Sequence, residues 1–214
     1  MRTRPMKIPP LPLLILSCAA LVGCAPERAP EKEANAQILA EAVAKPEDCL
    51  LLVWSNQEER RVDFDRENDF VEGGAISCAT GTSASQFDAA IAALREAAKS
   101  GNKARILEEI GLPLLYIDAQ GNRREIEDRQ EVEAVFDEIF DPAMLDLLQQ
   151  LDLSRMSVAK DQGAFFDLGA LWLVVDRDGG RPRLMTVNRQ ALDEAITAAR
   201  DQAERNQGHP VPFD

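Results

Sequence analysis

The chain of 214 residues contains few of the side chains on which enzyme active sites usually depend. It has one histidine, His209, and one tyrosine, Tyr116, and aromatic residues make up only 5% of the sequence. Histidine is the commonest acid–base and metal-binding side chain near neutral pH, so chemistry that needs several histidines is excluded. We therefore expect no metal and no cofactor.

Cationic residues are also scarce. The chain has 24 lysines and arginines against 37 acidic residues, which gives a formal net charge of −13. Three of the cations and none of the acids lie before Cys24, so the remainder of the chain is more acidic still. An acidic surface repels phosphate groups, and we expect no nucleic-acid partner and no binding to anionic lipid head groups.

The sequence lacks an unbroken apolar run long enough to cross a membrane. Arg2, Arg4 and Lys7 precede an apolar segment at residues 8–22, which three prolines interrupt. A membrane-spanning helix needs about 20 consecutive apolar residues. A positive start followed by a short apolar run is instead typical of an export signal.

Leu21-Val22-Gly23-Cys24 ends this segment and resembles the lipobox of bacterial lipoproteins. The resemblance implies that residues 1–23 are a cleaved signal peptide and that lipid on Cys24 anchors the chain to a membrane. Ala25 stands where an aspartate favours the inner membrane in Gram-negative lipoproteins, which implies an outer-membrane protein facing the periplasm. Residues 24–45 would then be a lipidated tether. The alternative is an ordinary secretory signal with an incidental cysteine.

Cys49 and Cys78 remain once Cys18 and Cys24 are assigned to this N-terminal segment. An exported protein with one remaining pair of cysteines is expected to form a disulfide between them. A zinc site is the weaker alternative, because two thiols and His209 fall short of four ligands.

Residues 46–82 show the pattern of a small β piece that this disulfide supports. Residues 50–54 form an apolar run, residues 61–65 alternate with period two, and a polar stretch lies between them. This order predicts a β-hairpin. Trp54 on it is a candidate interaction anchor or a core residue.

Helical and strand patterns alternate over residues 83–188, followed by a C-terminal helix and tail at 189–214. Ser85-x-x-Asp88 is a capping pair for a first helix with one apolar face. Asn102, Asp128 and Asp141-Pro142 are expected to start three further helices, and Asn188 the last one. Expected strands are 112–117, 123–127, 156–158, 163–166, 171–175 and 184–187. This order of elements indicates an α+β fold.

Three motifs then carry a second resemblance: Leu112-Pro113-Leu114, Phe136-x-x-Ile139-Phe140-x-Pro142, and Gln162-Gly163 followed by Gly169-x-x-Trp172. Residues 87–188 resemble the nuclear-transport-factor-2-like (NTF2-like, cystatin-like) cone domain, and are similar to uncharacterised exported bacterial proteins that carry it. The resemblance implies a curved antiparallel sheet wrapped on N-terminal helices. It implies fold rather than activity, because the function of that group is mostly unassigned.

Enzymes with this cone usually place an aspartate or histidine inside it, and Asp167 is the candidate here. Burial among Phe165, Phe166 and Leu168 would favour its protonated form and make it a stronger general base. The alternative, which we favour, is that Asp167-Leu168-Gly169 forms a tight turn between two strands. Tyr116, Phe165 and Trp172 are candidates to line a pocket for a small apolar ligand, or to belong to the core.

Three functions follow from these patterns. The first is a non-catalytic lipoprotein that binds another envelope component. The second is a cone pocket that holds a small ligand or works as an enzyme through Asp167. The third is an envelope enzyme-inhibitor module, loosely similar to lysozyme-inhibitor lipoproteins, because residues 78–85 are rich in serine. An open cavity ending on Asp167 would favour the second, and a filled core with exposed apolar residues near Trp54 would favour the first.

Overall fold

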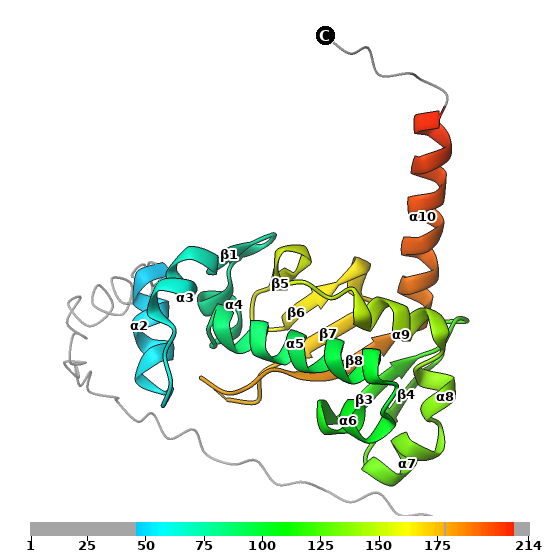
Figure 1. Cartoon of the computed structure of the whole chain (residues 1–214), viewed down its shortest axis with the longest axis horizontal. Helices are drawn as coiled ribbons and strands as arrows, with labels where there is room; N and C mark the ends of the chain where they lie inside the picture. The colour runs from blue at the N-terminus through cyan, green and yellow to red at the C-terminus, as the bar shows by residue number, and fades with distance from the viewer. Residues whose placement is uncertain (1–45, 178, 208–214) are drawn as a thin grey trace, which may run out of the picture. The chain divides into compact units, whose positions relative to one another are not determined.

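The computed structural model of the chain describes residues 46–177 and 179–207. The proposed signal peptide, lipid site at Cys24 and tether lie outside the described residues, as does the C-terminal tail with His209. The described part combines helices with a curved mixed sheet (Figure 1). None of its helices is both long enough and apolar enough to cross a membrane.

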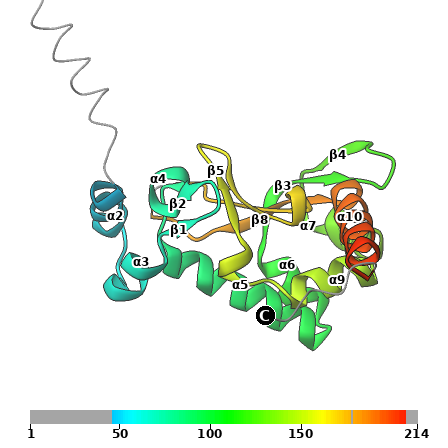
Figure 2. The ribbon, with the colours of Figure 1, turned by 90° about the horizontal axis from the view of Figure 1, so that it is seen from above.

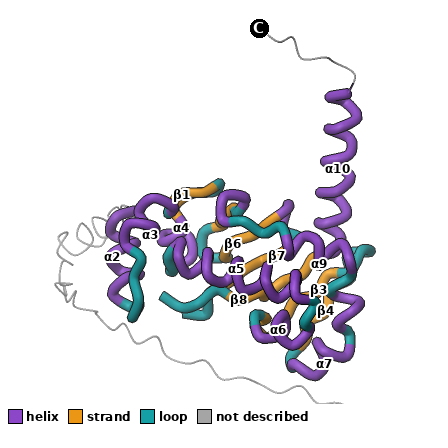
Figure 3. Tube along the Cα trace, in the orientation of Figure 1, coloured by secondary structure: helices purple, strands orange, loops and turns teal. Residues whose placement is uncertain are grey.

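The N-terminal piece is helical, so the predicted hairpin of strands at 50–54 and 61–65 is wrong (Figure 3). It contains α2 (Pro46–Ser55), α3 (Val62–Asn68) and α4 (Ile76–Thr80), with only a two-residue hairpin, β1 (Phe70–Val71) and β2 (Gly74–Ala75). The apolar run lies on a helix because its burial has helical spacing. Leu50, Val53 and Trp54 are buried, whereas Leu51 and Leu52 are each 60% exposed.

The predicted disulfide between Cys49 and Cys78 is confirmed. It joins α2 to α4, with 5.2 Å between the two Cα atoms. Helices of ten and five residues are too short to be stable alone in water. The covalent link therefore stabilises the contact between these two short helices.

Six strands form the main sheet in the order β4-β3-β8-β7-β6-β5. They are β3 (Ile110–Ile117), β4 (Arg123–Ile126), β5 (Ser157–Ala159), β6 (Gly163–Phe166), β7 (Leu171–Val174) and β8 (Arg183–Asn188). The strands predicted between residues 112 and 187 are thus confirmed. The expectation of a purely antiparallel sheet is wrong, because β3 and β8 pair in parallel, Tyr116 opposite Val187.

The small hairpin attaches to the main sheet at its β5 edge. Glu72 forms a parallel bridge with Ser157, and the backbone N–H of Val158 donates to the carbonyl oxygen of Glu72 at 2.8 Å. The side-chain hydroxyl of Ser157 donates to the Glu72 carboxylate at 3.1 Å. The N-terminal piece thereby covers an edge that would otherwise expose unpaired backbone groups.

Helices cover one face of the sheet (Figures 1 and 2). The longest of these, α5 (Ala84–Ser100), packs against α9 (Pro142–Gln149). The shorter helices α6 (Lys103–Glu108), α7 (Arg129–Ala134) and α8 (Phe136–Ile139) lie near one end of the sheet (Figure 1). The last helix, α10 (Arg189–Gln207), leaves the end of β8 and runs away from the sheet (Figure 1).

The helix caps at Asn102, Asp128, Asp141 and Asn188 are confirmed, since each side chain accepts a backbone N–H of the following turn. The Ser85–Asp88 capping pair is not formed. The N-cap of α5 is Ser83, two residues earlier, and the backbone N–H of Ser85 donates to the carboxylate of Asp65 instead.

Side chains fill the space between the helices and the sheet. The helices contribute Phe87, Ile91, Leu94, Phe136, Met144 and Leu148, the loop after α8 contributes Phe140, and the strands contribute Leu114, Phe166, Leu171, Leu173 and Val187. Each of these side chains is at most 3% exposed. The side of the sheet that the helices cover is therefore a packed core.

Reduction of the disulfide should destabilise the protein by about 3–4 kcal/mol, because it frees a loop whose ends are 29 residues apart. Urea unfolding with and without reductant measures this difference. The double variant Cys49→Ser/Cys78→Ser is the control and should not respond to reductant. Equal unfolding midpoints for the oxidised and reduced protein would contradict the expected contribution.

Candidate functional site

Asp167 lies on a tight turn at the protein surface. The turn is the 3-10 segment η2 (Asp167–Gly169), in which Asp167 and Leu168 have φ angles of 44° and 57°. The carboxylate is 26% exposed and forms an ion pair with Arg155 at 3.0 Å. Asp167 therefore has the geometry of a tight turn between two strands, and the guanidinium of Arg155 balances its charge.

A groove of about 530 Å³ passes beside this ion pair. One wall is formed by Asp167, Arg155 and Phe165, and the other by alanines of α10, among them Ala195 and Ala199. The two charged side chains of the first wall, Asp167 and Arg155, form an ion pair with each other. The groove can accept an apolar group against Phe165 and the alanines, but it offers no unpaired base.

The three predicted lining residues do not share one cavity. Phe165 and Trp172 are cross-strand neighbours whose rings stack at 4.8 Å, on the sheet face opposite to the packed core. Tyr116 points into the core, is 5% exposed, and donates its hydroxyl to the backbone oxygen of Glu138 at 3.3 Å. Burial and the nearby charge of Glu138 raise the pKa of Tyr116 above its usual value.

A buried polar site that the sequence did not reveal lies around Asp65. The carboxylate of Asp65, which is fully buried, accepts the indole N–H of Trp54 and the backbone N–H of Ser85, each at 2.8 Å. A negative charge at the first turn of α5 also interacts favourably with the helix dipole. Asp65 occurs in a stretch that alternates like a strand, and no local signal marks it as buried.

Further polar side chains extend this buried site. Gln57 donates to the hydroxyl of Ser83 at 3.0 Å, and the hydroxyls of Ser83 and Ser85 lie 3.0 Å apart. Thr82 donates to the carbonyl oxygen of Gly180, which follows β7, at 2.8 Å. Because each buried group has a partner, the network costs little and joins the N-terminal piece to the main sheet.

A second buried carboxylate, Asp69, caps the short helix α4. It is 1% exposed and accepts the backbone N–H and the hydroxyl of Ser77, both at 2.8 Å. Burial raises the pKa of Asp69 above its usual value near 3.8, and the charge of Asp65 raises it further, although the two bonds from Ser77 lower it in part.

Within residues 46–177 and 179–207, no three histidine, cysteine or acidic side chains are grouped closely enough to hold a metal ion. Comparisons with known protein families, with curated proteins and with solved structures found no match to this chain.

Asp65→Asn should lower the free energy of unfolding by about 2–4 kcal/mol, because an amide has one acceptor oxygen and leaves a buried donor without a partner. Asp63→Asn, on the exposed side of the same helix, is the matched control and should change it by less than about 0.5 kcal/mol. Urea unfolding followed by tryptophan fluorescence measures both. Similar effects of the two substitutions would show that the buried carboxylate of Asp65 does not hold α2 against α5.

Asp69→Asn tests the raised pKa through the pH dependence of stability. A raised pKa means that the folded protein binds the proton more tightly than the unfolded chain. The stability of the wild-type protein relative to the Asn variant should therefore fall as the pH rises from about 3.8 through the raised value. Urea unfolding of both proteins over a pH series measures this difference, and a difference that stays flat or rises would refute the assignment.

Proposed function

We propose that this chain is a lipid-anchored protein of the bacterial cell envelope whose folded part is a non-catalytic binding module. The lipobox-like segment ending at Cys24 and the polar, proline-bearing stretch after it support an anchor followed by a tether. Ala25 supports the outer membrane, facing the periplasm, as the location.

The disulfide supports export. Disulfides form and persist in oxidising compartments such as the bacterial periplasm and are rare in the cytosol. Cys49 and Cys78 lie in two different helices and are joined in the folded protein. A chain that depends on this link for its N-terminal piece is suited to the periplasm.

The filled core is the observation that carries the non-catalytic part of the proposal. An enzymatic cone needs an enclosed space in which a buried acid or base meets its substrate, whereas large apolar side chains fill the space between the helices and this sheet. Asp167 lies outside that core and is paired with Arg155. Leu51 and Leu52, exposed on α2 close to Trp54, also favour binding over catalysis.

The proposal includes the finer fold assignment, an NTF2-like cone over residues 83–188. The curvature of the six-stranded mixed sheet and the packing of α5 and α9 on one of its faces support it. The N-terminal disulfide piece and α10 are additions to such a domain.

The alternatives receive less support from the geometry. A catalytic pocket that uses Asp167 would require the carboxylate to leave Arg155 and gain an enclosed space. An inhibitor module that uses the serine-rich stretch would require exposed serines. Ser83 and Ser85 are instead 0% and 7% exposed and bond to each other and to Gln57 and Asp65.

Substitution of the lipobox cysteine tests the anchor. In a Gram-negative host, the wild-type protein should fractionate with the outer membrane, and its intact mass should exceed that of the polypeptide from Cys24 onward by the mass of the attached acyl chains. Cys24→Ala should abolish both the added mass and the outer-membrane association, whereas Cys18→Ala, a cysteine six residues earlier within the signal, should change neither. A Cys24→Ala protein that still fractionates with the outer membrane, or an unmodified wild-type mass, would overturn the proposal.

A further inference from the structure

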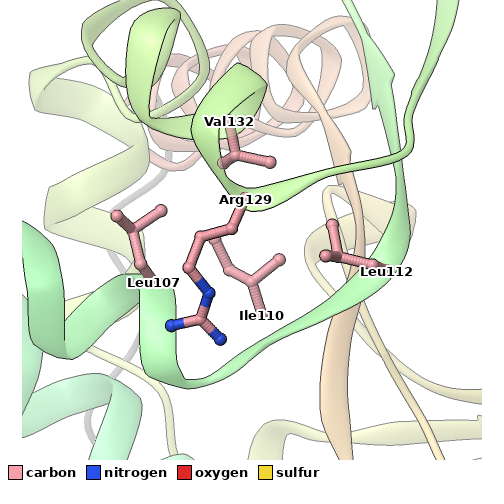
Figure 4. A pocket seen from close by; sticks show the side chains of 5 residues that line it. All are labelled: Leu107, Ile110, Leu112, Arg129 and Val132. Atoms are coloured by element: carbon pink, nitrogen blue, oxygen red, sulfur yellow. The ribbon is translucent and has the colours of Figure 1, made fainter.

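A second groove, of about 450 Å³, lies where the ends of β3, β7 and β8 meet α6 and α7. Its apolar part consists of Ile110, Leu112, Val174 and Met185. It adjoins a small depression in which Arg129 stands beside Leu107, Ile110 and Leu112 (Figure 4). The volume is within the range of small-molecule sites in proteins.

The floor of this groove is shaped by Gly111 and Met185. A β-bulge in the pairing of β7 with β8 places Met185 between Leu184 and Thr186 without a partner of its own. Its sulfur lies so close to Gly111 that a Cβ atom at position 111 would collide with it. Methionine is flexible and polarisable, so this floor can adapt to apolar groups of different shapes.

Four charged residues, Arg129, Arg183, Glu108 and Asp176, also line the groove. Among the residues described by the structure, none of these four side chains forms an ion pair. The Arg183 guanidinium donates to the backbone oxygen of Glu108 at 2.6 Å and keeps its other donors. Some arginines elsewhere on the described surface pair with carboxylates, as Arg181 does with Glu109 at 2.6 Å.

We propose that this groove binds a short zwitterionic apolar molecule, namely an apolar amino acid or a dipeptide. Arg129 and Arg183 present guanidinium donors that suit a carboxylate, and the carboxylates of Glu108 and Asp176 suit an ammonium group. The apolar side chain of the ligand lies on Met185 and Val174. The site is separate from the Asp167 groove, and its occupation does not depend on lipid anchoring.

Titration calorimetry of the purified full-length protein with dileucine tests this site. Dileucine should bind saturably, and N-acetyl-dileucine and dileucine amide, each lacking one charge, should bind about tenfold more weakly or worse. Free leucine distinguishes the two sources of the ligand: a tighter complex with leucine assigns the site to amino acids, and a tighter complex with dileucine assigns it to peptides. No saturable binding of either, or equal binding of the capped and uncapped forms, would overturn the proposal.

The variant Arg129→Gln tests whether Arg129 binds the carboxylate of the ligand. It should weaken dileucine and N-acetyl-dileucine about tenfold but leave dileucine amide unchanged, because the amide has no carboxylate to lose. Arg200→Gln, an exposed arginine on α10, is the matched control and should affect none of the three ligands. An unchanged thermal midpoint verifies that each variant is folded, and equal losses for dileucine and its amide would refute the assigned role of Arg129.

Discussion

The buried carboxylate of Asp65 joins the N-terminal helices to the rest of the protein. It accepts one hydrogen bond from Trp54 in α2 and one from the first turn of α5, the helix around which the core is packed. A charge so deeply buried is tolerated only when its lone pairs are used, and both oxygens have donors here. The bridge from Glu72 to β5 is a second attachment of the same piece, and the disulfide links α2 to α4 within it.

This attachment has a consequence for function. Buried polar bonds and apolar side chains, among them Ile76 and Ala79, hold the N-terminal piece against the main domain, and the disulfide links two helices within that piece. Aromatic and large aliphatic side chains of the main domain form its packed core. What remains for recognition is the surface: exposed leucines on α2, and grooves beside the sheet.

The main domain was predictable because its elements are long or have distinct boundaries. The stripe of Phe87, Ile91 and Leu94 indicates α5, and the caps at Asn102, Asp128 and Asp141 mark the helices after it. The structure of the N-terminal piece was not predictable in this way, since a five-residue apolar run fits a buried strand as well as a helix segment. Leu51 and Leu52 lie on the solvent side of α2, a fact that periodicity over so few residues does not show.

The sequence by itself determined the pairing of Cys49 with Cys78, because no other cysteines remain outside the N-terminal segment, and it determined the caps, because a cap acts within one helical turn. Only the tertiary structure decided the parallel pairing of β3 with β8, the burial of Asp65, and the position of Asp167 on the surface beside Arg155. These features arise where segments distant along the chain or from different elements meet. Their geometry is set by the packing of the whole domain and leaves no local signature in the residues that form them.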